Sequence, residues 1–96
     1  MEWLVTYDIE THDRAGERRL ARVAKICEGY GLRIQYSVFE CRLSPAALES
    51  LVQELAITID PDLDSINIYQ FPGEISSARR TLGRPLGTTT GTPWIV

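Results

Sequence analysis

An α+β fold in one domain is predicted by three observations: two segments with helical periodicity, several segments that alternate like strands, and the order of the two kinds. That order is strand, helix, long strand or hairpin, helix, strand. It is typical of the ferredoxin-like βαββαβ sandwich, in which an antiparallel sheet carries both helices on one face. A chain of 96 residues has room for one hydrophobic core. We therefore expect a single domain over residues 1–96, with an extra C-terminal strand.

The first predicted strand, within residues 1–9, ends near a carboxylate. Residues 3–5 are apolar in succession, as in a strand buried on both faces. Because side chains alternate, one face carries Leu4, Thr6 and Asp8, and the other carries Trp3, Val5, Tyr7 and Ile9. Asp8 precedes a polar loop, where α/β proteins commonly place ligand groups. The alternative is that Asp8 only caps a turn.

The first helix is predicted from about Arg14 to Glu28, with N-cap side chains at 11–13 and stopping glycines at 29 and 31. Its apolar stripe consists of Leu20, Val23, Ala24 and Cys27. The opposite face carries Arg14, Arg18, Arg22 and Lys25, and Arg19 flanks the stripe. Such a basic row is either a solvated face or a surface for a phosphate backbone, which the arginine fork suits.

The net charge of -3 argues weakly against a nucleic-acid partner, but the charges are segregated. Bases gather in the first helix, whereas residues 43–78 contain acids and no base. A basic side and an acidic side are therefore expected. Cys27 and Cys41 are too few and too isolated for a disulfide framework, so both are interpreted as reduced packing residues.

The segment 32–43 alternates but is long for one strand, and a bend or hairpin near 35–37 would divide it. Phe39 is the unusual residue, because the other side chains on its face are mostly polar. It either fills a core or subunit interface, or it lies against a nucleotide. Further on we expect a helix starting at Ser44-Pro45 and ending before Asp60-Pro61, a strand over 65–71, a short helix or turn within 75–82, and a loop to residue 92.

Both helices on one face leave the other sheet face without cover, and we expect Trp3, Val5 and Tyr7 to lie on that uncovered face. A twofold homodimer is the commonest way to bury such a surface. The tail of about 84–96, with its apolar end at 94–96, is expected to add to the sheet of the partner. No run reaches the roughly 20 apolar residues of a membrane helix, and the N-terminus lacks the pattern of a signal peptide. A cytoplasmic location without a membrane partner is expected.

Four stretches of the sequence carry a resemblance: "YDI" at the end of the first strand, the arginine-rich helix ending in "GYG", "RIQYSVFECRLSP" and "DSINIYQF". Together they resemble the small CRISPR-associated Cas2 family over essentially the whole chain. The family is described as metal-dependent endonucleases that also serve in spacer acquisition beside the Cas1 integrase. The resemblance therefore implies a CRISPR function, with Cas1 and nucleic acid as partners.

The resemblance also implies site residues. Asp8 would face its symmetry mate across the interface of a homodimer and bind a divalent metal such as Mg²⁺. Arginines of the first helix and second strand would contact the nucleic-acid backbone. The implied nucleic-acid residues are Tyr7, Arg18, Arg19, Arg22, Arg33 and Phe39, and Arg14 is a further candidate. The loop from Ile9 to Arg18 is longer than usual for the family, so the match of Arg14 to a family arginine stays open.

The chemistry of the residues leaves two main functions open. Two Asp8 carboxylates could share one Mg²⁺, which prefers oxygen ligands and keeps several waters, and the ion would assist hydrolysis. Glu10 and Asp13 lie in the loop, and the single His12 is interpreted as a bystander. Catalysis resting on one carboxylate per chain would be slow. The alternative is a non-catalytic DNA-binding scaffold of the integrase complex. A lower alternative is a ferredoxin-like regulatory dimer that binds a small ligand. The substrate, duplex DNA or single-stranded RNA, stays open.

Overall fold

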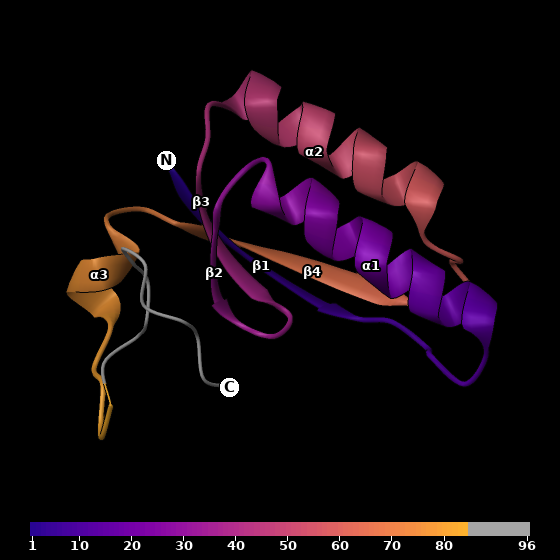
Figure 1. Ribbon diagram of the computed structural model, residues 1–96. Helices are drawn as coiled ribbons and strands as arrows, with labels where there is room; N and C mark the ends of the chain where they lie inside the picture. The colour runs from indigo at the N-terminus through magenta and orange to yellow at the C-terminus, as the bar shows by residue number, and fades with distance from the viewer. Residues whose placement is uncertain (85–96) are drawn as a thin grey trace.

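The computed structural model describes residues 1–84 and confirms the ferredoxin-like α+β fold (Figure 1). Its elements are β1 (Glu2–Asp8), α1 (Arg14–Glu28), β2 (Leu32–Gln35), β3 (Val38–Arg42), α2 (Pro45–Thr58), β4 (Ser65–Phe71) and α3 (Ile75–Ala78). The strands form one antiparallel sheet in the order β2-β3-β1-β4. The long helices α1 and α2 lie side by side on one face of it. The tail that was expected to pair with a partner lies outside the described residues, apart from its first position.

The predicted division of segment 32–43 is confirmed. Tyr36 and Ser37 form the turn between β2 and β3, and the register shifts between Arg33 and Gln35. The amide of Tyr7 donates a 3.1 Å hydrogen bond to the carbonyl of Ser37. The hairpin is thereby fixed to the C-terminal part of β1, which brings its turn close to Asp8.

The starts of both long helices follow the capping signals in the sequence. The Asp13 carboxylate accepts a 2.9 Å hydrogen bond from the amide of Gly16, and the Ser44 hydroxyl accepts one of 3.1 Å from Ala47. Gly16 also allows a close approach of the helix to the β1–α1 loop. A Cβ at this position would lie only 2.0 Å from the carbonyl oxygen of Glu10. The first turn of α1 is therefore held tightly against the loop that follows β1.

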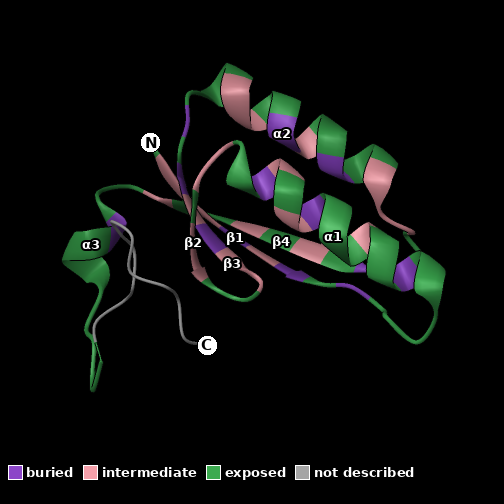
Figure 2. Cartoon of the chain, in the orientation of Figure 1, coloured by how far each residue is buried: buried purple, intermediate pink, exposed green. Residues whose placement is uncertain are grey.

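The core lies between the sheet and the two long helices (Figure 2). Val5 of β1 has 0% exposure, and its register partner Phe39 of β3 also has 0%. Tyr7 is buried on the same face, and the Trp3 indole Nε1 donates a 3.2 Å hydrogen bond to the carbonyl of Leu43. The expectation that Trp3, Val5 and Tyr7 lie on the uncovered face is therefore wrong. The helices pack on the more apolar of the two faces, which buries more apolar surface.

The uncovered face carries the alternate residues of the same strands. Thr6 lies opposite Val38 and Asn67, and Asp8 lies opposite Ser65. The face is completed by Glu2, Leu4, Leu32, Glu40, Arg42, Tyr69 and Phe71. It is thus a mixed surface of apolar, polar and charged side chains, less apolar than the sequence predicted. Its cover by a partner stays a prediction.

α3 is tied to the end of the uncovered face that is remote from Asp8. The amide of Ile75 donates a 2.7 Å hydrogen bond to the Glu2 carboxylate, which also accepts one from Arg42. Arg79 forms an ion pair with Glu40. These contacts leave the Asp8 end of the face open within residues 1–84.

The two cysteines are free and buried. Burial raises the pKa of Cys27 to about 12 and that of Cys41 to about 11. Both thiols are therefore protonated at neutral pH and act as packing residues, as predicted. Among the described residues, no helix is long and apolar enough to cross a lipid bilayer.

Candidate functional site

Asp8 is the last residue of β1 and has an exposed side chain on the uncovered sheet face. Its neighbour Ile9 points the other way into the core, so the end of the strand is anchored. No backbone amide of residues 1–84 donates a hydrogen bond to the Asp8 carboxylate. This argues against the turn-capping alternative, because a cap would accept such a bond. Asp8 is thus a free oxygen ligand on a rigid strand end.

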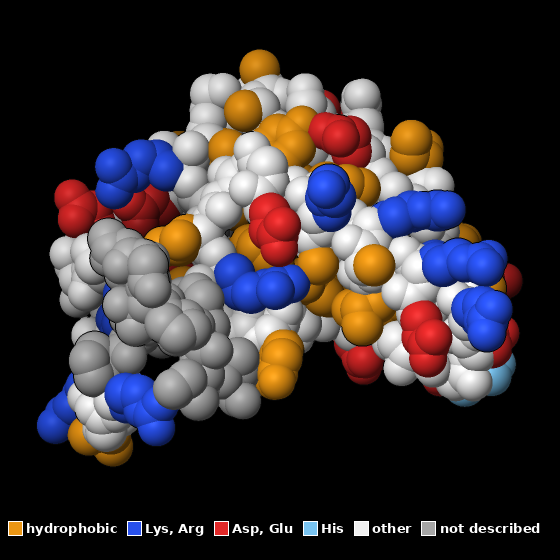
Figure 3. Space-filling model, in the orientation of Figure 1, with side chains coloured by type: hydrophobic (Ala, Val, Ile, Leu, Met, Phe, Trp, Pro, Cys, Tyr) orange, Lys and Arg blue, Asp and Glu red, His pale blue; other side chains and the backbone are white. Residues whose placement is uncertain are grey.

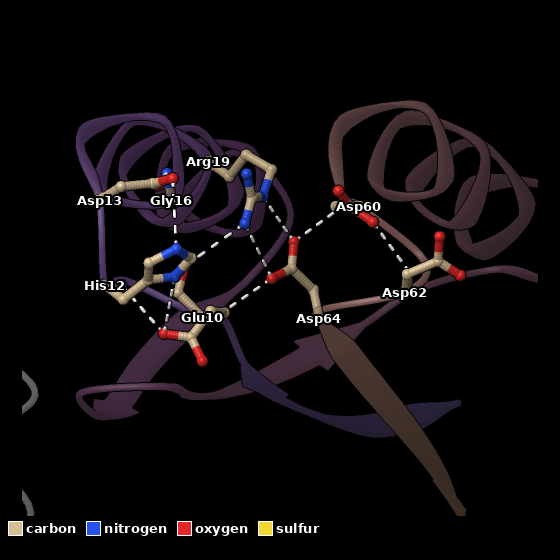
Figure 4. A network of polar contacts seen from close by, with 8 residues as sticks. All are labelled: Glu10, His12, Asp13, Gly16, Arg19, Asp60, Asp62 and Asp64. Atoms are coloured by element: carbon tan, nitrogen blue, oxygen red, sulfur yellow. Dashed lines mark hydrogen bonds and ion pairs between the residues drawn. The ribbon is translucent and has the colours of Figure 1, made fainter.

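The loop after Asp8 is held by a buried carboxylate that sequence reasoning missed, Asp64 (Figure 4). Asp64 Oδ1 accepts a 3.0 Å hydrogen bond from the amide of Glu10, and Oδ2 accepts one of 2.9 Å from Asp60. Arg19 Nε donates a 2.7 Å hydrogen bond to Oδ2. The Asp64 side chain has no exposed surface. One carboxylate therefore joins the end of β1, the α1 helix and the α2–β4 loop.

The ionisation of Asp64 follows from two opposing effects. Burial raises the pKa of its carboxyl group, whereas the Arg19 guanidinium and the amides of Asp60 and Glu10 lower it. The lowering effects are the larger in sum, so the pKa of Asp64 lies below its ordinary value of 3.8. At neutral pH Asp64 is an anion paired with Arg19, whose own pKa is raised by this pairing.

Arg19 differs from the other predicted nucleic-acid arginines because it is paired with a buried carboxylate. Its side chain is 14% exposed and lies over the buried carboxylate. Its Nη2 also donates to the carbonyl of Glu10 at 3.4 Å. The structure gives Arg19 a structural role, and its contact with nucleic acid stays a prediction. The sequence signal that could have suggested the structural role was the position of Arg19 beside the apolar stripe.

The remaining basic residues of α1 are free. Arg14, Arg18, Arg22 and Lys25 are exposed and form no ion pair with the acids of residues 1–84. Figure 3 shows Lys and Arg side chains gathered over α1, on the right of the view. Free guanidinium groups on one face of a helix are suited to phosphate groups of a nucleic-acid backbone.

Tyr7 and Phe39 both belong to the core, with exposed fractions of 6% and 0%. Their rings are stacked with centroids 6.2 Å apart, and the Tyr7 hydroxyl donates a 3.2 Å hydrogen bond to the carbonyl of Tyr36. Burial raises the pKa of Tyr7, although Arg33 partly opposes this effect. The predicted contact of Phe39 with nucleic acid is thus corrected, because the ring has no exposed surface, and that of Tyr7 stays a prediction. Both side chains are on the face that the helices cover, and of the two alternatives for Phe39 the core is the one observed.

Arg33 is half-buried beside this aromatic pair. Its guanidinium carbon lies 5.2 Å from the centroid of the Phe39 ring, a cation–π distance. Its Nη1 lies 3.8 Å from a carboxylate oxygen of Glu28. The structure therefore keeps Arg33 available at the protein surface with a fixed orientation.

A metal ion at Asp8 would need ligands beyond one chain. Residues 1–84 contain no group of three His, Cys, Asp or Glu side chains placed to hold an ion. His12 is exposed and lies 3.4 Å from both the Glu10 and the Asp13 carboxylates, which agrees with its interpretation as a bystander. The chemistry of Asp8 fits Mg²⁺ only if a second carboxylate, phosphate oxygens or waters complete the shell.

Together, the fold and the site define a class: small ferredoxin-like proteins with a free aspartate at the end of the first strand and a basic first helix. Residues 1–77 match the family described as CRISPR associated protein Cas2. The chain belongs to this family, which confirms the resemblance.

Curated relatives and a solved structure agree with this family assignment. The chain is 52% identical over 66 residues to the CRISPR-associated endoribonuclease Cas2 of Chlorobaculum tepidum, with 69% of each chain covered. It is 48% identical over 67 residues to the CRISPR-associated endonuclease Cas2 of Halalkalibacterium halodurans, with 70% of each covered. The crystal structure of Streptococcus pyogenes Cas2 at pH 6.5 superposes with a TM-score of 0.79 at 43% identity, covering 86% of this chain and 100% of that one.

Proposed function

We propose that this protein acts in CRISPR adaptation as a homodimer that binds nucleic acid and cleaves it slowly at a metal site made by two Asp8 side chains. The observation that carries the proposal is the position of Asp8, exposed at the end of β1 on the uncovered sheet face. A second copy stacked on this face about a twofold axis would bring the two carboxylates toward each other. The names of the relatives, endoribonuclease and endonuclease, support a nuclease role.

The residues of the site have separate tasks in this proposal. The two Asp8 carboxylates would hold a Mg²⁺ ion, since Mg²⁺ binds through one or two carboxylates and keeps several waters. The chemistry that such an ion would supply is polarisation of a phosphoryl oxygen and a more acidic coordinated water. Asp64 holds the loop after Asp8 through a hydrogen bond from the amide of Glu10. This contact fixes the path of the chain at the end of β1, where Asp8 lies.

The basic row of α1, defined as Arg14, Arg18, Arg22 and Lys25, supplies the backbone contacts. Exposed side chains free of ion pairs within residues 1–84 support this role. Such contacts do not depend on base sequence. They suit both duplex DNA and single-stranded RNA; one relative is named an endoribonuclease, and the name of the other, endonuclease, specifies no substrate. We propose the Cas1 integrase as the protein partner, on the basis of family membership. The expected cytoplasmic location stays a prediction.

A non-catalytic scaffold of the integrase complex is the second candidate. It is favoured because each chain supplies only Asp8 to the proposed metal site, and because residues 1–84 contain no ready metal cluster. In that case the basic row and the dimer matter, and Asp8 does not.

A nuclease assay separates the two candidates. Wild type and Asp8→Ala are incubated with single-stranded RNA and with duplex DNA, each with Mg²⁺ and with chelator. Cleavage by wild type only in Mg²⁺, and none by the variant, supports the nuclease. An integration assay that needs the protein while wild type cleaves neither substrate supports the scaffold.

A further inference from the structure

A cavity of about 500 Å³ lies beside Asp8, between α1 and the β2–β3 turn. Its lining includes Tyr7, Asp8, Leu20, Ala24, Arg33 and Tyr36. Figure 3 shows hydrophobic side chains grouped in this region, next to the basic side chains over α1. The volume is within the usual range of small-ligand pockets, roughly 300–1,000 Å³. The proposed contacts of the phosphate backbone do not use this cavity.

The walls of the cavity suit a flat aromatic group. Leu20, Ala21 and Ala24 give α1 an apolar surface here, and the two alanines leave space above the helix. Tyr36, at the β2–β3 turn, is 66% exposed and stands free to stack. Stacking of a nucleobase on an aromatic side chain contributes about 1–3 kcal/mol without dependence on the base.

The polar groups of the cavity favour a neutral ligand that offers an acceptor. Arg33 Nε is buried and has no hydrogen-bond acceptor among the described residues. A buried donor without an acceptor is uncommon in folded proteins. The Arg33 side chain as a whole is 31% exposed, and its guanidinium offers further N–H groups to a base carbonyl or ring nitrogen. Asp8 and Glu17 are also among the lining residues, and their negative charges disfavour a phosphate inside the cavity.

The location of the cavity connects it with the backbone-binding surface. At about 100° per residue, Ala21 lies between the cavity side of α1 and the face with Arg14, Arg18 and Lys25. A strand whose phosphates contact the basic row can therefore direct one base over Ala21 into the cavity. Because Asp8 lines the same cavity, the seated base would determine which phosphate lies at Asp8.

We propose that this cavity receives one unpaired base of the bound nucleic-acid strand, stacked on Tyr36 and hydrogen-bonded to Arg33. The inference rests on the proposed nucleic-acid function and makes it more specific. A base inside a perfect duplex must first leave the stack, which costs a few kcal/mol. The protein should therefore prefer strands or bulges with an unpaired base over perfect duplexes of equal charge.

The test compares three duplexes of equal length: a perfect duplex, one with a single-nucleotide bulge, and one whose bulge is abasic. The two bulged duplexes have the same number of phosphates and differ only in the base. Wild type should bind the base-bearing bulge about tenfold more tightly than the abasic one, as expected for one stacked base. Ala21→Phe, which fills the cavity without changing charge, should bind both bulges equally and keep the affinity of wild type for the perfect duplex. Tyr36→Ala should also lose the preference.

Ala56→Phe is the matched control, since Ala56 is exposed on α2 and does not line the cavity. It should retain the tenfold preference. Equal binding of both bulges by wild type, or a full preference in Ala21→Phe, would overturn the inference while leaving backbone binding intact. Tight binding of free nucleosides with no preference among the duplexes would overturn it in favour of a small-ligand site. Failure of all three duplexes to bind would overturn both the inference and the proposed binding of duplex DNA.

Discussion

Arg19 Nε lies 2.7 Å from Oδ2 of Asp64, a carboxylate with no exposed surface. The two residues are 45 positions apart, and their pairing joins α1 to the loop before β4. Asp64 also accepts a hydrogen bond from the amide of Glu10, two residues after Asp8. Through this contact Arg19, which flanks the apolar stripe of α1, supports the loop that follows the candidate metal ligand.

Replacement of Asp64 should therefore destabilise the protein. Asp64→Ala leaves the amides of Glu10 and Asp60 without their acceptor, and a buried donor without an acceptor costs about 1–3 kcal/mol. Chemical denaturation should give a free energy of unfolding lower by about 2 kcal/mol or more. Asp62→Ala is the control, because its side chain is exposed and should change stability little. Similar losses in both variants would contradict the role of Asp64.

The pairing also predicts a dependence of stability on pH. The pKa of Asp64 is lower in the folded protein than its ordinary value of 3.8. Its stabilising contribution is thus complete above about pH 4 and is lost as the pH falls through the lowered pKa. Asp64→Asn should flatten the acid side of a plot of Tm against pH. If the plot had the same acid slope as that of wild type, the pKa of Asp64 would not be lowered in the folded state.

Binding of duplex DNA should depend on salt through the basic row of α1. Each lost phosphate contact lowers the slope of log K against log salt by about 0.9. Arg18→Ala combined with Arg22→Ala should therefore reduce the slope by about 1.8, with little effect on the fold because both side chains are exposed. Arg80→Ala, exposed but outside α1, is the control. An unchanged slope in the double variant would make the row a plain solvated face.

The thiols should react slowly. Burial raises the pKa of Cys27 to about 12 and that of Cys41 to about 11, and the thiolate is the reactive form. An aromatic disulfide reagent at pH 8 should label the native protein slowly and the denatured protein at once. Rapid labelling of the native protein would mean that this core opens readily.

Much of the fold could be predicted because its signals are local. Asp13 and Ser44 cap the helices, and the β2–β3 turn falls within the expected interval. The face of the sheet that the helices cover could not be predicted so well. Alternation along β1 separates Val5 from Thr6, but it does not say which of them faces the helices. That depends on the register that sets Val5 beside Phe39 and Ile68, which is a long-range property.

The candidate site shows the same division. Asp8 and the exposed arginines were predicted from position and helical spacing. Asp64 was missed, since its partners come from distant segments. Arg19 and Phe39 were assigned to nucleic acid because an arginine and an aromatic side chain suit that role, whereas the structure places one on a buried carboxylate and the other in the core.

The dimer itself can be tested by light scattering. The proposed partner covers the mixed face that includes Thr6, Val38 and Asp8, so the protein should have twice the mass of one chain at micromolar concentration. Removal of residues 92–96 should weaken the dimer if the tail adds to the partner's sheet. A well-folded monomer of the intact chain would contradict the proposed assembly.

The central claim is that two Asp8 carboxylates meet in the dimer and share a cation, and thermal melting of Asp8→Asn tests it most directly. Two carboxylates that face each other repel, by about 1 kcal/mol at 4 Å even in water, and a bound cation removes this cost. The amide keeps the shape of the side chain without its charge. Asp8→Asn should therefore raise the Tm in chelator and change it little, or lower it, in Mg²⁺. Equal shifts of the Tm in the two buffers would contradict the claim that the carboxylates meet.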